Sequence, residues 1–545
     1  MAGGTWQTQN KVRPGAYINV IGVPKPLSSV GERGVVAVPM ALSWGDQVIS
    51  LSAQDLVKGD SLLKVGLSYS DADALPFRLL FEGAASAIIY RTNYTVATKA
   101  SVSVLGVGTV TATSAGAFGN NIAIKFEKDT SGGSPVYFLK TYISGTLQVT
   151  QKSSTLTDLA GNDWVTVAFQ ESPTLSTSTE VLDLTGGTDM PSAVKASVTV
   201  AGVGTVTAKT AGSAGNSLAV KFEKVTDGGD TTYNLKTYEG ETLKDTSTAA
   251  TIKGLSGNSY IDFAPVESPS LDADTEKLSL VGGVDGGIPS TALSSALAEL
   301  QQHTWNTLAA PVSESTDKAQ VKAYIKQLRD DEGTKVQAVI PQYDADDECI
   351  ISGWNSYRLS DNSIVSVNDA TFLIAGITAG ASLIESNSGR VISDAIEVVS
   401  GPRTNEDIID GLNSGKFILS RRADGAIIVE SDINSLHTLT PKKGYVFTKN
   451  RPLRVLDNIA NDVKALFISS YLGKVSNDDD GRKIFKADLI SYFNKLQSIG
   501  AIQNFDSEKD LTISAGEAID AVVVECWVQP VDSMEKLYMK VNVEG

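Results

Sequence analysis

The sequence has little cysteine, little histidine and no long apolar run. Its 545 residues include two cysteines, Cys349 and Cys526, and two histidines, His303 and His437. Two cysteines cannot form a disulfide framework or a four-cysteine zinc site. No window approaches the roughly 18 apolar residues that a transmembrane helix needs, and the first twenty residues lack the apolar core of a signal peptide. We therefore expect a protein that folds in a cytosol.

The charge balance is acidic, with 46 Lys and Arg against 63 Asp and Glu, a net charge of −17. Such a chain is a poor candidate for wrapping nucleic acid or coating an anionic membrane. Hydrophobic residues make up 42% and charged residues 20% of the chain, which is typical of folded domains. At about 150 residues per domain, the length predicts three or four domains.

A duplicated module occupies the middle of the chain. Residues 100–190 and 196–286 align at a constant offset of 96 without a gap, and 47 of the 91 aligned pairs are identical. Within the first copy, Ile122, Ile124 and Phe126 alternate with polar or small residues, which is the period of a half-buried strand. Roughly six or seven short strands per copy, without a helical stretch, predict a β-sandwich.

Helices and strands alternate on both sides of this duplication. Alternation of this kind predicts a largely parallel sheet with helices on its faces. We interpret both sides as one α/β domain that the sandwiches interrupt; two separate small domains are the alternative. The predicted helices are 71–84, 291–301, 315–331 (capped by Ser315 or Thr316), 368–381 and 405–413; the predicted strands are 87–90, 304–309, 335–340 and the hairpin 417–420 with 426–430.

The last hundred or so residues predict two long helices and two strands. Asn450 is expected to cap a helix over 451–472 that ends at Gly473. The second helix is expected over 482–498, and the strands over 519–528 and 536–543.

Both ends of the chain have strand-like alternation and little to hold them locally. Ala16, Ile18 and Val20 alternate near the front, as do the residues of 536–543 at the back. A terminal strand can add to the sheet edge of another chain. Pairing within the same chain is the alternative, and the pattern leaves both open.

Motifs for catalysis or ion binding are incomplete. Residues 411–417 have three residues between the glycines of a phosphate loop instead of four, and Phe417 replaces the hydroxyl that binds magnesium. A calcium loop around 478–481 would need a carboxylate at Ala487. Neither histidine has a Gly-x-Ser-x-Gly neighbourhood, so we expect structural histidines and buried cysteines. No catalytic residue, metal ligand or cofactor is predicted; an α/β hydrolase-like enzyme with β-sandwich binding modules is the alternative.

Several separated motifs resemble one protein family in the order in which they occur. The chain resembles the contractile tail sheath proteins of phages and of phage-tail-like bacteriocins of Gram-positive bacteria. The resemblance implies a subtilisin-like α/β core without a catalytic triad, and the second sandwich is a departure from the family. The motifs are 13–17 (RPGAY), 205–208 (TVTA), 306–311 (NTLAAP), 328–333 (LRDDEG), 375–380 (AGITAG), 449–457 (KNRPLRVLD), 485–488 (FKAD) and 529–532 (QPVD).

The resemblance also implies domain limits and a function. Subunits would polymerise as stacked hexameric rings around a tail tube and contract to drive the tube through a target cell envelope. Partners would be further copies, the tail tube protein, and baseplate and tail terminator proteins, without nucleic acid or membrane insertion. The particle, a virion tail or a tail-like particle, would assemble in the bacterial host cytoplasm. The expected parts are an N-terminal arm (1–23), the first part of the α/β core (24–97), the two sandwiches (98–190 and 194–287), the subtilisin-like α/β domain (289–430), a C-terminal sheath domain (431–535) and a C-terminal arm (536–545).

Two sets of site residues follow from the resemblance. The arms are expected to exchange strands between subunits, and basic residues of the C-terminal helices are expected to face the tube. The strand-exchange set is Tyr17, Ile18, Asn19, Val20, Met539, Lys540, Val541, Asn542 and Val543. The tube-facing set is Lys449, Arg451, Arg454, Arg482, Lys483 and Lys486.

Overall fold

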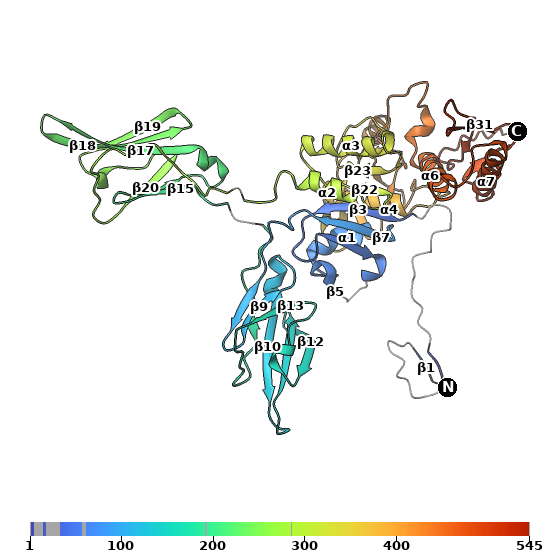
Figure 1. Ribbon diagram of the computed structural model, residues 1–545. Coiled ribbons are helices and arrows are strands. Elements are labelled where there is room, and N and C mark those ends of the chain that lie inside the picture. Colours follow the sequence, from blue (N-terminus) through green and yellow to red (C-terminus); the bar gives the residue numbers. More distant parts are fainter. Residues whose placement is uncertain are drawn as a thin grey trace. The chain divides into compact units, whose positions relative to one another are not determined.

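The computed structural model describes residues 2–4, 15–17, 33–56, 61–190, 193–284 and 286–543. It is a mixed α/β, multidomain chain with several separate sheets (Figure 1). Two compact units are distinguished: Met1–Met40, Gln47–Arg91 and Leu293–Gly545 form one, and Ala41–Asp46 with Thr92–Ala292 form the other. Within the described ranges, no helix has both the length and the apolar character to cross a membrane.

A six-stranded sheet in the order β24-β23-β22-β3-β7-β4 organises the first unit. Its pairings are parallel except for β4 against β7, which confirms the prediction of a largely parallel sheet. Thr307 pairs with Val36, so strands from before and after the duplication lie in one sheet. The strands are β3 (Val35–Met40), β4 (Val48–Ser52), β7 (Ser86–Arg91), β22 (Thr307–Ala309), β23 (Gln337–Val339) and β24 (Ile350–Ile351).

Helix α4 (Val367–Gly380) is buried over nearly its whole length and packs against α1 (Leu75–Leu80). The close approach depends on glycine, because a Cβ at Gly376 would lie 2.0 Å from the Leu80 carbonyl oxygen. Ser366 caps α4 in a capping box with Asp369. The other helices of this part are α2 (Ala292–Leu300), α3 (Ser315–Asp330) and α5 (Asn405–Asn413).

The predicted cap of α3 is wrong, because Glu314 precedes this helix and no side chain caps it. The predicted hairpin is confirmed as β28 (Leu419–Arg421) paired with β29 (Ile427–Val429). A second small sheet joins β25 (Ser356–Leu359), β26 (Ile364–Val365) and β27 (Ala395–Ser400).

Each copy of the duplicated module folds into a four-stranded and a three-stranded antiparallel sheet around one apolar cluster. Phe126 and Leu139 in the first copy, and the aligned Phe222 and Leu235 in the second, are fully buried. The first copy contains β8 (Ser101–Val104), β9 (Gly108–Ala112), β10 (Ile122–Asp129), β11 (Val136–Ile143), β12 (Thr146–Ser153), β13 (Val165–Phe169) and β14 (Leu182–Asp183). The second contains β15 (Ser197–Val200), β16 (Gly204–Ala208), β17 (Leu218–Asp227), β18 (Asp230–Glu239), β19 (Thr242–Ala249), β20 (Ile261–Pro265) and β21 (Leu278–Ser279).

The two copies differ at one aromatic cluster. In the first copy, Trp44 stacks on Trp164 with ring centroids 5.8 Å apart and meets the edge of Phe118 at 5.2 Å. The aligned positions in the second copy are Tyr260 and Ala214. Residues 41–46 therefore cover a face of the first sandwich, whereas Tyr260 is 36% exposed.

The C-terminal part is built on two helices that pack through Phe485, Leu489 and Phe493. Helix α6 (Asn450–Leu466) continues into a π-helical turn, Phe467–Tyr471, and α7 (Asp479–Ser498) follows. The strands are β30 (Ile502–Gln503), β31 (Leu511–Ala515), β32 (Val522–Cys526) and β33 (Gln529–Pro530).

Two predictions for this part are wrong. Lys449, not Asn450, occupies the cap position of α6, because the Asn450 amide instead donates a 2.9 Å hydrogen bond to Asp432. Residues 536–543 form no strand, since they find no partner strand among the described residues.

Two segments with motif-like sequences have structural roles. Gly415, with φ of 67°, follows the end of α5, and the Lys416 ammonium lies 4.2 Å from the centroid of the Trp354 ring. Asp478 caps α7 by accepting a 2.8 Å hydrogen bond from the Gly481 amide.

Replacing Trp44 by alanine is expected to destabilise the first sandwich alone. Loss of a buried Trp side chain costs about 3–5 kcal/mol, and Trp44 contacts aromatic rings of the first copy only. Hydrogen exchange of the full chain should show faster exchange for β10 amides and unchanged exchange for β17. Tyr260→Ala, at the position aligned with Trp164, is the matched control. If Trp44→Ala reduced the protection of both copies equally, the assignment of Trp44 to the first sandwich would be refuted.

Candidate assembly interface

The hairpin of β31 and β32 is a two-stranded sheet whose outer edges pair with no described strand. Strand β31 keeps Leu511 and Ile513 toward α7, whereas β32 is exposed at four of its five residues. Val523 and Val524 of β32 are both exposed apolar residues. An unpaired apolar edge is a template for a strand of another chain.

The segment 536–543 is the apolar counterpart of that edge. Its residues have no assigned secondary structure. Between 69% and 89% of the surface of its apolar residues is exposed: Leu537, Tyr538, Met539, Val541 and Val543. The C-terminal half of the predicted strand-exchange set, Met539 to Val543, lies in this segment.

The N-terminal half of that set is only partly described. Tyr17 ends β2 (Gly15–Tyr17), which pairs in parallel with β1 (Ala2–Gly4). Ile18, Asn19 and Val20 lie outside the described residues.

Two residues of the predicted tube-facing set are buried within their own subunit. Arg454 is 1% exposed and donates hydrogen bonds to the carbonyl oxygens of Ser382 at 3.2 Å and Glu385 at 2.8 Å. Lys449 donates to Ser431 at 3.0 Å and forms an ion pair with Glu535. Both cations thus have partners within their own subunit, and their predicted contact with a tube stays a prediction.

The remaining four residues of that set differ in their exposure. Lys483 is exposed beside Asp480, at 3.1 Å, and Arg482 donates to Asn477 at 2.8 Å. Arg451 and Lys486 are partly exposed. Their contact with a tube stays a prediction.

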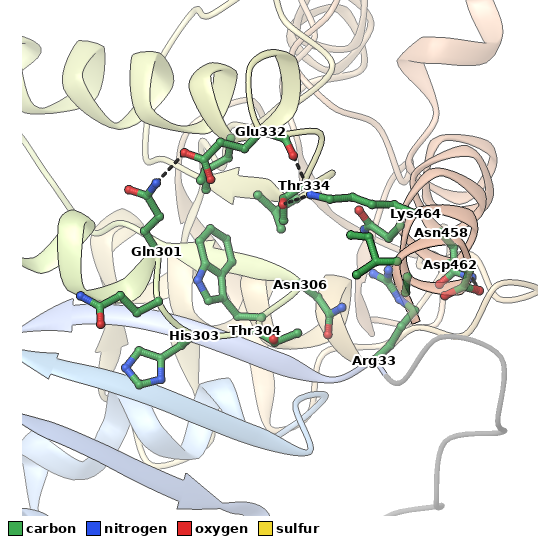
Figure 2. A pocket seen from close by; sticks show the side chains of 17 residues that line it. Arg33, Gln301, His303, Thr304, Asn306, Glu332, Thr334, Asn458, Asp462 and Lys464 are labelled. Atoms are coloured by element: carbon green, nitrogen blue, oxygen red, sulfur yellow. Dashed lines mark hydrogen bonds between the residues drawn. The ribbon is translucent and has the colours of Figure 1, made fainter. Parts of the chain in front are cut away.

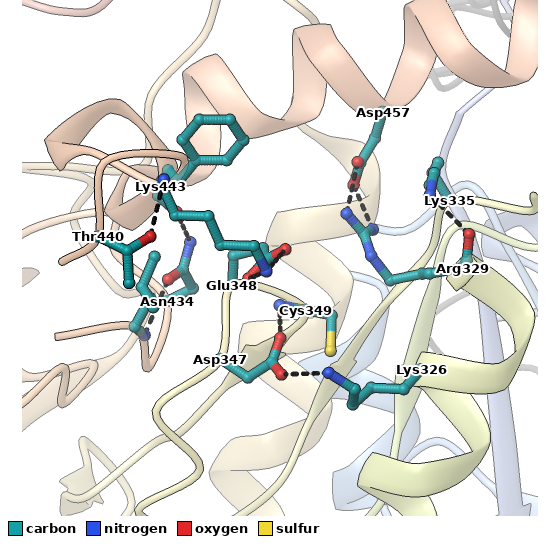
Figure 3. Close-up of polar contacts among 12 residues, drawn as sticks. Lys326, Arg329, Lys335, Asp347, Glu348, Cys349, Asn434, Thr440, Lys443 and Asp457 are labelled. Atoms are coloured by element: carbon teal, nitrogen blue, oxygen red, sulfur yellow. Dashed lines mark hydrogen bonds and ion pairs between the residues drawn. The ribbon is translucent and has the colours of Figure 1, made fainter. Parts of the chain in front are cut away.

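A buried ion pair joins α3 to α6 (Figure 3). Arg329 donates two parallel hydrogen bonds to Asp457, at 2.7 and 2.8 Å, and a third to the Val336 carbonyl at 3.0 Å. Each side chain of the pair is 9% exposed. Bidentate geometry with low exposure makes this a strong and specific contact between the sheet-bearing part and the C-terminal helices.

An acidic loop after β23 makes further contacts at this junction (Figure 3). Glu348 pairs with Lys443 at 2.6 Å, and Asp347 accepts hydrogen bonds from Lys326 at 3.4 Å and the Cys349 amide at 3.2 Å. Burial and the neighbouring Asp347 charge raise the pKa of the Cys349 thiol well above its ordinary value. Cys349 is a buried core residue, as predicted.

Cys526 does not fit the same prediction, because it is exposed. It is the last residue of β32, and no other strand among the described residues pairs with this hairpin. An accessible thiol thus marks the open edge.

A cavity of about 490 Å³ lies between the loop before β22 and the middle of α6 (Figure 2). Burial and the nearby charge of Arg454 lower the pKa of Arg33 to about 9. Lys464 is held by the Glu332 carbonyl at 2.6 Å and the Thr334 hydroxyl at 3.2 Å. Among the described residues lining the cavity there is no serine or cysteine.

The two histidines occupy different surroundings. His303 lines this cavity, with its Nε2 atom 3.8 Å from Glu299. His437 places its Nδ1 atom 3.1 Å from the Ser435 carbonyl and 3.4 Å from Asp346. The amides of His437 and Thr438 both donate to Asp346 at 2.9 Å, which fits a structural role for this loop.

Comparison with known proteins gives consistent matches. Residues 286–435 match the family model of the phage tail sheath protein central domain, and residues 442–544 match that of the phage tail sheath C-terminal domain. The chain is 31% identical to the phage-like element PBSX protein XkdK of Bacillus subtilis, with all of both chains covered. It is 29% identical to the tail sheath protein of Clostridium phage phiCD119 over 39% of this chain and 60% of that protein.

Solved structures give the same result for the fold. The sheath tail protein of Desulfitobacterium hafniense superposes with a TM-score of 0.66 at 30% identity, covering 97% of this chain and all of that one. The sheath tail protein of Listeria innocua has a TM-score of 0.66 at 24% identity, covering 93% and 94%.

Asp457→Asn is expected to destabilise the first unit, because it leaves the Arg329 charge buried without its counter-ion. Breaking one partner of a buried pair costs about 3–5 kcal/mol. The check is the urea midpoint of the full chain. Asp424→Asn is the control, since its pair with Arg422 is exposed and should leave the midpoint unchanged. Equal midpoints for both variants would show that the buried pair contributes nothing.

Proposed function

Because this chain belongs to the phage tail sheath family, whose members are structural proteins and not enzymes, we propose that it polymerises as stacked hexameric rings around a tail tube and contracts to drive the tube through a cell envelope. Its partners are further copies of itself, the tube protein, and the baseplate and terminator proteins of the tail. The tail particle to which it belongs assembles in the host cytoplasm. We also propose the subtilisin-like character of the α/β core and the domain limits given above.

The observation that carries the proposal is the coexistence of an open sheet edge and an unpaired apolar segment in one subunit. Eight residues in extended conformation span about 26 Å at 3.3 Å each, so 536–543 can reach beyond its own subunit. A strand added to β32 gains backbone hydrogen bonds whatever its sequence, and its side chains supply specificity.

The alternation of the two segments is compatible with such pairing. In β32, Val522 and Val524 share a face, and Val522 packs on the helical core. In the C-terminal segment, Leu537, Met539 and the two valines 541 and 543 share a face in the same way. One register therefore places both apolar faces on the same side of an enlarged sheet.

A contact between the arm of one copy and the hairpin of another is head-to-tail. Repeated head-to-tail contacts generate rings or helical filaments and leave no copy without a neighbour until the assembly ends. Contraction is then a change of the same subunits from an extended lattice to a contracted one. The extended lattice is held kinetically. A preference of about 1–3 kcal/mol per subunit for the contracted lattice is an ordinary coupling energy. Summed over many copies, it becomes large.

Two further contacts belong to the same proposal. We also propose that Tyr17 to Val20 form the N-terminal exchanged strand, as the family resemblance implies. Of the basic residues, Lys483 is the most exposed and is the best candidate to contact the tube, with Arg451, Arg482 and Lys486 beside it.

Deletion of residues 536–545 or of residues 1–21 is expected to leave a folded, soluble protein that does not polymerise. Residues 536–543 are exposed and belong to none of the apolar clusters of the described residues. Circular dichroism and size-exclusion chromatography check the fold, and negative-stain imaging checks the polymer. Tubes of normal length from both deletions would contradict the proposal.

Cys526 offers a direct measure of strand addition. In the free subunit a maleimide should label Cys526 and spare the buried Cys349, which serves as internal reference. Assembly should slow the labelling of Cys526 at least tenfold, because the added strand covers the edge. Cys526→Ser should abolish the labelling and so show that the labelled thiol is Cys526. Unchanged labelling of Cys526 after assembly would mean that β32 does not accept the added strand.

A further inference from the structure

Among the described residues of the C-terminal segment, Glu535 is the last whose side chain contacts the rest of the subunit through hydrogen bonds and an ion pair. After β33 pairs with β30, the Val531 amide still donates to the Ala501 carbonyl at 3.0 Å. At Glu535 the side chain reaches the sheet-bearing part of the unit, and from Lys536 onward no described strand pairs with the chain.

Four side chains converge on the Glu535 carboxylate. Lys449 donates to it and forms an ion pair with it. Hydroxyl groups donate to it from Ser388 at 2.6 Å, Ser533 at 3.2 Å and Ser431 at 3.3 Å. Only 18% of the Glu535 side chain and 6% of the Lys449 side chain are exposed, so the pair is largely shielded from water.

A buried carboxylate holds the residues that precede Ser388 and follow Lys449 in the chain. Asp432, 1% exposed, accepts hydrogen bonds from the Asn387 amide at 3.0 Å and from Asn450 at 2.9 Å. The Asp432 amide in turn donates to the Ser388 hydroxyl at 2.8 Å. Ser388 therefore links the Glu535 carboxylate to a connected polar network around Asp432.

We propose that Glu535 is a positioning residue for the C-terminal arm: it fixes the point at which the arm leaves the subunit and transmits load on the arm to the α/β core. The inference rests on the proposed exchange of strands between subunits. It adds to that proposal an anchor, made of Lys449, Ser388 and Ser431, that keeps the free segment as short as 536–545.

The chemistry of the contact suits an anchor under load. Charge-assisted hydrogen bonds are about twice as strong as neutral ones. Burial alone would raise the pKa of Glu535, but the hydrogen bonds from Lys449 and Ser388 and the Lys449 charge outweigh it, so the pKa lies below its ordinary value. The anchor is thus fully formed at neutral pH and is lost only as the pH falls through that lowered pKa.

Without the anchor, the last fixed residue is Val531, whose amide donates to Ala501, and the free segment gains the residues 532–535. A longer lead lowers the effective concentration of the arm at its acceptor. It also lets a neighbour move without pulling on the subunit.

The chain contains its own reporters of the anchor, Lys536 and Lys540, which trypsin recognises. A protease needs several extended residues around the cleaved bond, so the anchor should protect the bond after Lys536 and not the bond after Lys540. In the unassembled full chain, Glu535→Ala should raise the cleavage rate after Lys536 at least tenfold and leave the rate after Lys540 unchanged.

The controls separate the anchor from general stability. Glu535→Gln retains an oxygen that accepts from Ser388, so it should give an intermediate rate. Glu508→Ala removes the same charge from an exposed residue of the same part and should change neither rate. A melting temperature close to that of the parent shows that the variants fold. An unchanged ratio of the two cleavage rates in Glu535→Ala overturns the inference.

Assembly distinguishes this inference from the proposed function. If the anchor is as described, Glu535→Ala subunits still protect Cys526 on assembly, because the arm still docks, but yield fewer ordered tubes than Glu508→Ala. If strand exchange is wrong, deletion of 536–545 leaves assembly intact while the trypsin result stands. Ordered tubes of Glu535→Ala equal in number to those of Glu508→Ala would refute the load-bearing role.

Discussion

The parallel pairing of β3 with β22 is the constraint on which the rest of the structure depends. It joins Val36 to Thr307, so segments from before and after the long insertion lie in one sheet. Closing a loop costs entropy that rises only slowly with loop length, about 0.6 kcal/mol for each doubling. A second sandwich therefore adds little to the cost of closing this sheet, which is a physical reason why the core tolerates the duplication.

Besides the apolar contact of Leu383 with the helical cluster, buried polar contacts join the C-terminal helices to the sheet-bearing part. Arg329 with Asp457, and Arg454 with Asp432, are buried pairs of residues distant in sequence. Buried ions are costly unless their geometry is satisfied, so such pairs tolerate few relative positions. They fix the base from which the terminal segment extends, whereas apolar contacts would allow it to slide.

Much of the fold was predictable from local pattern, and the failures share a cause. The parallel sheet, the helices and the repeated sandwiches follow from periodicity and from the internal alignment. The burial of Lys449 and Arg454 does not, because their partners Glu535 and Asp432 are set by tertiary contacts. Likewise Asn450 has the right residue type for a cap, but its amide bonds to Asp432 instead.

The open edge shows a second limit of sequence reasoning. Alternation in 536–543 predicts a strand that the described structure does not contain, because a strand exists only where a partner supplies its hydrogen bonds. Cys526 was expected to be buried because its neighbours are apolar. Apolar residues at a sheet edge show that the edge can pack against another segment, but they do not show that such a segment is present.

The two sandwiches show how the same fold adapts to different surroundings. Where Trp44 covers the first copy, Phe118 and Trp164 bury large aromatic surfaces. The second copy has Ala214 and Tyr260 at these positions and no described aromatic residue in place of Trp44. Two uncovered large aromatic rings would form an exposed apolar patch, which favours unspecific association. A small residue and an amphipathic tyrosine avoid that patch. The residues of the second copy therefore suit a sandwich face that no segment like 41–46 covers among the described residues.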